Sequence, residues 1–168
     1  FRRVLFRSAQ KVDRCAVAIA HVDGWVSTRV GEKITDPSPK VVVDVLRYWT
    51  PDAKNNQIVD FEEVRNFLAQ LPKMGFNIGL VTFDRWNSTD MIKYLNAVGI
   101  KADVLSVDNK QYITLASVIG EDRLVAPNDE ILRTELLQLK VMDNGKIDHP
   151  RVGGKDCADA VAGAVHNA

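Results

Sequence analysis

The sequence predicts a single α/β domain with a mixed sheet and helices on both faces. Extended segments come first and follow one another like the strands of an antiparallel meander, and helical and extended segments then alternate along the chain. Antiparallel neighbours need only turns, whereas parallel strands need crossovers, which helices supply. At 168 residues with 46% hydrophobic content, the chain is long enough to enclose one sizeable core.

The antiparallel part is predicted from apolar and β-branched runs that end at turn residues. Residues 15–22 form the first run and stop at Asp23-Gly24, which is expected to be a turn. Residues 25–30 then alternate as a returning strand would. After a loop with two prolines, residues 40–49 supply a third extended segment.

The rest of the chain alternates between helix and strand. Residues 61–74 have a hydrophobic stripe of helical period, with Asp60 as the N-cap and Gly75 at the end. The elements expected next are a buried strand at 76–83, a helix at 88–98 capped by Ser88 or Thr89, a strand at 101–107 with a turn at Asp108-Asn109, helices at 111–121 and 129–141, and a last helix from near Lys155.

Charge and composition exclude several classes of protein. Lys plus Arg and Asp plus Glu both number 22, so no net charge draws the whole chain to nucleic acid or an anionic surface. Cys15 and Cys157 lack the spacing of a zinc knuckle or disulfide scaffold, which fits a reducing compartment. No apolar run approaches the roughly 18 residues that span a bilayer, so no membrane role is expected. No GxxxxGK[ST] phosphate loop is present.

Residues 1–8 do not fit the rest of the chain. The stretch FRRVLFRS has three arginines but neither the apolar core nor the cleavage site of a signal peptide, and it does not resemble a strand. It looks like translated adapter or linker sequence joined to a truncated gene. Residues 1–10 are therefore expected to be a non-native leader, which leaves one domain at 11–168.

Residues 146–168 carry the richest chemistry. A loop with His149-Pro150 and Gly153-Gly154 leads into KDCADA and a helix of small residues. Asp156 and Asp159 are three residues apart, so their carboxylates project from one face of that helix, whose small residues let it lie close to a sheet. Two interpretations fit these acids. They belong to a buried metal site, or they are ordinary first-turn acids favoured by the helix dipole.

Asp84 is the second chemical feature, since it directly follows the apolar strand at 76–83. Functional groups gather at the carboxyl ends of strands in open α/β sheets. An aspartate is also a common turn or capping residue there. Two further residues, Glu135 and His149, each have two interpretations. Glu135 is either a buried acid paired with a basic residue or part of a solvated face, and His149 either binds metal or fixes its loop through a hydrogen bond.

Four segments carry a family resemblance: Asp84 after VTF, LSVD at 105–108, RTEL at 133–136, and DHP…GKDCADA at 148–160. Together they resemble the nuclease domain of bacteriophage terminase large subunits, over most of residues 12–168. The resemblance implies a ribonuclease H-like fold, with an antiparallel meander followed by parallel strands. It also implies an endonuclease that cuts concatemeric viral double-stranded DNA during genome packaging, with an ATPase domain upstream that residues 1–168 do not contain.

The resemblance further implies a metal site of three acids, which come from the first strand, the strand after the first helix and the start of the last helix. Asp84 matches the second and Asp156 the third, with Asp159 as the fallback. The expected catalytic residues are Asp84 and Asp156, and the expected metal ligands are Asp84, Asp156 and Asp159. Residues 1–8, where the first strand should lie, contain no acid. Hard oxygen ligands suit a pair of Mg²⁺ or Mn²⁺ ions.

Contact with double-stranded DNA is expected to rest on phosphate neutralisation, because no recognition-helix pattern is present. The candidates are Arg85, which adjoins Asp84, and three basic residues that flank the tail, Lys146, Arg151 and Lys155. The resemblance adds the portal protein and the small terminase subunit as partners, and the host cell cytoplasm as the location.

The hypothesis is that the intact parent is a metal-dependent endodeoxyribonuclease and that this chain, one carboxylate short, is weak or inactive. Three other functions are considered, of which the missing phosphate loop disfavours one, a small-ligand-binding α/β domain. A different ribonuclease H-like nuclease, of the resolvase or transposase type, would share the acids and differ in substrate. A docking or DNA-clamp module of the packaging motor would bind DNA in a salt-sensitive way without needing Mg²⁺ or Asp84.

Overall fold

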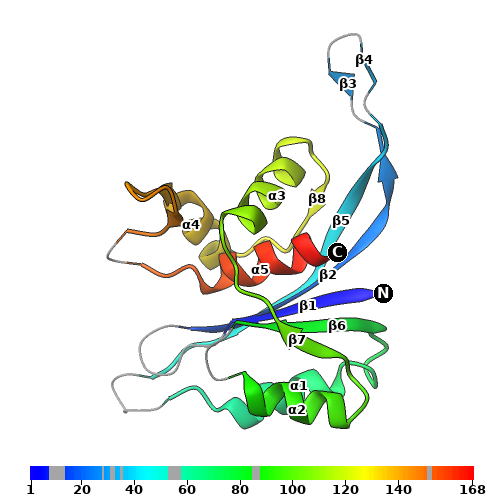
Figure 1. The fold of residues 1–168 in the computed structure, drawn as a ribbon, viewed down its shortest axis with the longest axis vertical. Helices are drawn as coiled ribbons and strands as arrows, with labels where there is room; N and C mark the ends of the chain where they lie inside the picture. Colours follow the sequence, from blue (N-terminus) through cyan, green and yellow to red (C-terminus); the bar gives the residue numbers. More distant parts are fainter. Residues whose placement is uncertain are drawn as a thin grey trace.

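The computed structural model describes residues 1–7, 14–27, 29–30, 33–34, 36–52, 58–84, 88–150 and 153–168. Within them, a six-stranded mixed sheet runs in the order β7-β6-β1-β2-β5-β8, with helices on both faces (Figure 1). The predicted fold class is therefore confirmed. No helix in these ranges is long and apolar enough to cross a membrane.

The sheet has an antiparallel part followed by parallel strands, as the sequence predicts. The antiparallel part consists of β1 (Arg2–Arg7), β2 (Cys15–Val26) and β5 (Ser38–Trp49), with β2 in the middle. The parallel strands are β6 (Ile78–Phe83) beside β1, β7 (Ala102–Val104) beside β6, and β8 (Leu124–Val125) beside β5. Two short hairpins complete the strands: β3 (Arg29–Val30) with β4 (Lys33–Ile34), and β9 (Lys140–Val141) with β10 (Ile147–Asp148).

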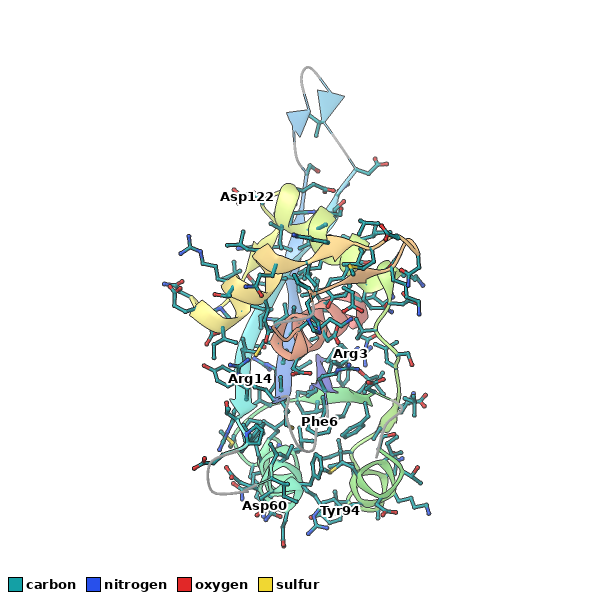
Figure 2. The ribbon with its side chains drawn as sticks, turned by 90° about the vertical axis from the view of Figure 1, so that its left-hand side faces the viewer. Arg3, Phe6, Arg14, Asp60, Tyr94 and Asp122 are labelled. Atoms are coloured by element: carbon teal, nitrogen blue, oxygen red, sulfur yellow. The ribbon has the colours of Figure 1, made fainter. Side chains whose placement is uncertain are left out.

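The helices form two layers. α1 (Phe61–Gln70) and α2 (Thr89–Ala97) cover one face of the sheet, and α3 (Asn109–Gly120), α4 (Glu130–Gln138) and α5 (Asp156–Asn167) cover the other (Figure 1). Each layer encloses its own hydrophobic core. Phe6 belongs to the core under α1 and α2, where Figure 2 shows its side chain, while Leu5 belongs to the core under α3, α4 and α5.

The expectation that residues 1–8 form no strand is wrong. β1 occupies the centre of the sheet, antiparallel to β2 and parallel to β6. Val4 and Leu5 are completely buried on opposite faces, so both cores depend on this strand. The physical reason is that a central strand is covered on both faces and needs apolar residues at consecutive positions, which VLF provides. The proposal that residues 1–10 are a non-native leader stays a prediction.

Two predicted turns are also wrong. At Asp23-Gly24 the chain continues along β2, and the pairing with β5 shifts register between Val22 and Trp25. Gly24 has a φ of +127°, which suits an irregularity in a strand as well as it suits a turn. Asp108 does not make a turn either. Its side chain accepts the backbone N–H of Lys110 and, with Gln111, forms a capping box that starts α3.

α5 lies directly on the sheet, as its small residues predict. Every residue from Asp156 to Val165 is buried. Gly163 lies over Leu5 of β1 so closely that a Cβ atom built at this position would be 2.1 Å from Leu5 Cδ1. At the far end of α5, Arg3 Nε donates to the backbone oxygen of Asn167 at 3.2 Å. The last helix therefore runs along the first strand and holds it.

Candidate functional site

Three carboxylates meet at the end of β1, around the side chain of Arg7. The guanidinium Nη1 of Arg7 pairs with Asp84 Oδ2, and its Nε lies 3.5 Å from Asp156 Oδ1 and 3.2 Å from Asp159 Oδ2. We call these four residues the acidic cluster. The structure thus brings together the three acids that the sequence singles out, although Asp84 follows β6 and the other two lie on α5, far along the chain. Their role as metal ligands stays a prediction.

Sheet pairing and strand alternation put these residues in one place. β1 and β6 run parallel, with Phe6 opposite Phe83, so Arg7 and Asp84 leave the sheet at the same edge. Successive side chains of a strand point to opposite faces. Arg7 therefore shares the face of Leu5, which packs on α5, and reaches the first turn of that helix.

The acidic cluster is poorly exposed to solvent. The side chains are 19% exposed for Asp84, 8% for Asp156, 2% for Asp159 and 26% for Arg7. Burial raises the pKa of Asp159, while the cationic groups of Arg7 and Lys155 pull that pKa down. Burial disfavours the charge on Arg7, but the Asp159, Asp84 and Asp156 carboxylates outweigh it and raise the pKa of Arg7. The three carboxylates thus favour the charged form of Arg7, and Arg7 in turn opposes the effect of burial on Asp159.

Asp159 has the most elaborate surroundings in the cluster. The Tyr112 hydroxyl donates to Asp159 Oδ1 at 2.5 Å, and Lys155 Nζ lies 3.8 Å from the same oxygen. Burial, followed by the charge of Asp159, raises the pKa of Tyr112, so the phenol remains a donor. Arg7, Tyr112 and Lys155 all contact Asp159, and the choice of Asp156 over Asp159 as the third acid of the site stays a prediction.

The structure describes two of the four candidate DNA-binding residues. Lys146 is exposed and Lys155 half-buried, and both line a cavity of about 440 Å³ together with Asp108 and Asp148. Lys155 Nζ is 3.4 Å from Asp148 Oδ1, so its charge already has partners inside the protein. Arg85 and Arg151 lie outside the described residues. A role for these residues in binding phosphate stays a prediction.

Glu135 is a buried acid, which is the first of the two interpretations that the sequence leaves open. Its side chain is 4% exposed, and its Oε2 accepts the backbone N–H of Ala158 in the first turn of α5 at 2.9 Å. Arg14, labelled in Figure 2, is the basic partner, with Nη1 3.7 Å from Glu135 Oε1. Burial raises the pKa of Glu135 despite these favourable neighbours. Glu135 thus holds the start of the helix that carries Asp156 and Asp159.

Replacing Glu135 by leucine is expected to lower the free energy of unfolding by about 1–3 kcal/mol, because the Ala158 N–H loses its acceptor inside the protein. Glu135→Gln keeps an oxygen acceptor and should cost less. Urea unfolding at neutral pH measures both variants. The matched control is Glu130→Gln on the exposed surface of the same helix, which should stay within about 0.5 kcal/mol of the parent. Equal stability for Glu135→Leu and Glu130→Gln would contradict this role.

His149 makes the hydrogen bond that one of its two interpretations predicts. Its Nδ1 is 2.6 Å from the backbone oxygen of the next residue, Pro150, and its backbone N–H donates to Asp148 Oδ1 at 2.9 Å. Both interactions lie within the loop. The imidazole therefore fixes the loop that leads toward α5.

A divalent metal ion does not fit the acidic cluster as Arg7 arranges it. The carboxylate oxygens that would face an ion face the guanidinium instead. Within the described ranges, no group of three or more His, Cys, Asp and Glu side chains is placed to hold a metal ion. The donor set suits Mg²⁺ or Mn²⁺ by its chemistry, but not by its present geometry.

Arg7 and Tyr112 are the residues of this site that the sequence reasoning missed. The signal that could have revealed Arg7 is the short continuous apolar run of Val4, Leu5 and Phe6, which is consistent with a buried strand that ends at Arg7. Tyr112 has no comparable signal, because its partner Asp159 is 47 positions away.

The fold is that of phage large terminase nucleases, a ribonuclease H-like class. No protein-family model matches the chain, and no curated protein matches it by sequence. Among solved structures, the large terminase nuclease of the thermophilic phage G20c is similar with a TM-score of 0.69 and 15% identity, over 99% of this chain and 81% of that one.

Two longer large terminases share the same fold in part. For the HK97 bacteriophage large terminase the TM-score is 0.72 at 16% identity, and for the large terminase of a second thermophilic bacteriophage it is 0.70 at 12% identity. In each case 99% of this chain covers 39% of the other chain. The resemblance inferred from the sequence is thus confirmed as a likeness of fold.

Proposed function

We propose that this chain is a nuclease domain of a phage DNA-packaging terminase. The observation that carries the proposal is the convergence of Asp84, Asp156 and Asp159 at the end of β1. They come from the end of β6 and the start of α5, in a fold shared over 99% of the chain with the G20c large terminase nuclease. Acids at the carboxyl end of a parallel strand pair lie where α/β folds place their chemistry.

The proposed substrate is the phosphodiester backbone of double-stranded DNA. Lys146 and Lys155 line a cavity at the start of α5, where they would neutralise phosphate charge. Mg²⁺ or Mn²⁺ would serve the proposed hydrolysis. We assign the ions to a form of the domain that has a carboxylate at the end of β1. With Arg7 there, the proposed cleavage is weak or absent.

The carboxylate at the end of β1 can be supplied by Arg7→Asp, and we expect this variant to cut double-stranded DNA in the presence of Mn²⁺ or Mg²⁺. The parent chain is expected to leave the same DNA intact. The assay follows supercoiled and linear duplex DNA on gels. Asp84→Asn and Asp156→Asn, each added to Arg7→Asp, should abolish cutting, and Asp90→Asn on the exposed surface of α2 is the control that should not. A folded Arg7→Asp variant that binds metal and leaves all DNA uncut would overturn the proposal.

The substrate of the Arg7→Asp variant also separates the two kinds of nuclease. Preference for duplex DNA over four-way junctions and RNA–DNA hybrids supports a terminase. Preference for junctions would assign the domain to the resolvase type instead. The proposed setting, the packaging motor in the host cytoplasm with its portal protein and small terminase subunit, rests on the large terminases that share the fold.

A non-cleaving clamp module is the second candidate, and the charge pairing of Arg7 with three acids favours it for the chain as it stands. A clamp would bind duplex DNA with an affinity that falls steeply with salt, and neither Mg²⁺ nor Asp84→Ala would change it. Fluorescence anisotropy with a labelled duplex, at several salt concentrations, measures this directly.

A further inference from the structure

We propose that Arg7 is a built-in counter-cation that takes the place of a divalent ion in the acidic cluster. The chain then does not bind Mg²⁺ or Mn²⁺ at this cluster, and it gains that ability when Arg7 is replaced. The inference uses the same three acids as the proposed function, but it concerns their occupant and does not depend on whether the domain cuts DNA.

The contacts of Arg7 support this assignment. One guanidinium reaches all three carboxylates, with Nη1 on Asp84 and Nε within 3.5 Å of Asp156 and Asp159. A bound Mg²⁺ needs oxygen ligands at about 2.0–2.1 Å around a common centre. The Arg7 guanidinium lies among these three carboxylates instead, where such an ion would have to sit.

The charges lead to the same conclusion. The cluster holds three carboxylates, against which Arg7 contributes one positive charge and Lys155, 3.8 Å from Asp159 Oδ1, contributes a second. A dication would therefore have to enter a site where a cation already sits, and the charge of Arg7 would repel it. Removing Arg7 leaves three neighbouring carboxylates without this cation, and hard oxygen ligands of this kind are the ones that Mg²⁺ and Mn²⁺ prefer.

β1 also keeps Arg7 in place. The backbone of Arg7 pairs with Ala16 of β2. Leu5, two residues earlier on the same face, packs tightly under Gly163. The guanidinium can leave the cluster only by swinging its side chain into solvent. That movement would take the guanidinium away from the buried carboxylates of Asp156 and Asp159, at a large cost.

Binding of Mn²⁺ alone tests the proposal, measured by electron paramagnetic resonance of the free ion and by calorimetry. The parent chain is expected to show no saturable site at millimolar Mn²⁺. Arg7→Gln and Arg7→Asp are expected to bind at one site at least about a hundredfold more tightly, because a neighbouring positive charge has been removed. In the same variants, Mn²⁺ should raise the melting temperature, and Asp156→Asn added to Arg7→Asp should reverse both effects.

Arg65→Gln is the matched control, because it removes a guanidinium that pairs with the exposed Glu62 far from the cluster. It should gain no metal site. The parent chain tests the inference even where the variants fold poorly, since saturable Mn²⁺ binding by the parent that Asp156→Asn removes would overturn it. Metal binding by Arg7→Asp without DNA cutting would instead leave this inference standing and count against the proposed nuclease.

Discussion

Arg7→Met is expected to lower the free energy of unfolding by about 3–5 kcal/mol at neutral pH, as for other buried charge clusters that lose one partner. The three carboxylates that face Arg7 are between 2% and 19% exposed, so water cannot replace the lost guanidinium. Urea unfolding of the parent and the variant measures the difference. The double variant with Asp159→Asn should recover part of the loss, because one of the three repelling charges is gone.

The size of this loss should depend on pH. Burial raises the folded pKa of Asp159, so between its ordinary value and the raised one the folded protein binds more protons than the unfolded chain. The stability that this group contributes falls as the pH rises through that window. Arg7 limits the rise in pKa, and its removal extends the window toward neutral pH. The deficit of Arg7→Met should therefore be small below about pH 4 and grow toward pH 7. A deficit that is constant across this range would contradict the ion pairing.

Gly163→Val is expected to destabilise the domain by about 3 kcal/mol or more, at the upper end of what overpacking costs. Even a single Cβ would lie 2.1 Å from Leu5 Cδ1, and Leu5 is completely buried in the centre of the sheet. Neither side can move freely, because α5 is buried along most of its length and β1 is paired on both edges. Thermal and urea unfolding measure the loss.

The matched control for Gly163 is Gly120→Ala at the end of α3, where an added Cβ meets nothing within 4 Å. It should be neutral or stabilise by about 0.5–1 kcal/mol, the usual gain when alanine replaces a helical glycine. Leu5→Ala combined with Gly163→Val should restore part of the lost stability by opening space. If Gly163→Val and Gly120→Ala unfold alike, the close approach of α5 to β1 is wrong.

The sequence predicts the periodic parts of this fold well. α1 begins at the residue after its predicted cap, Asp60, and β5 and β6 lie where valine-rich and apolar runs place them. Short strands without a periodic signal escape prediction, as β8 does with two residues that pair only with β5. The turn predicted at Asp23-Gly24 is wrong because glycine suits a turn and an irregular strand equally. β1 escapes prediction because residues 1–8 resemble linker sequence, and its arginines meet their partners, the acids and the C-terminal end of α5, only in three dimensions.

The acids of the candidate site could be predicted from the sequence, but the residues that contact them could not. Asp84 and Asp156 stand next to a strand end and a helix start, and such boundaries can be recognised along the chain. Arg7 contacts Asp84, which is 77 positions away, Tyr112 contacts Asp159 at 47 positions, and Glu135 contacts Ala158 at 23 positions. These contacts depend on the sheet order and on how the helices pack on the sheet. A local pattern carries no information on that order, so the occupant of the cluster became clear only from the structure.

The pairing of β1 with α5 has a consequence for when this domain can fold. Arg3 and Asn167, which are joined by a hydrogen bond, are 164 positions apart. One face of the central strand therefore has no cover until the last helix has been synthesised and has docked. During translation Leu5 and Arg7 lack this helix as a neighbour until residues 156–167 have left the ribosome. Closing so long a loop comes late and slowly in folding, so the hydrophobic face of the sheet is open to chaperones throughout that time.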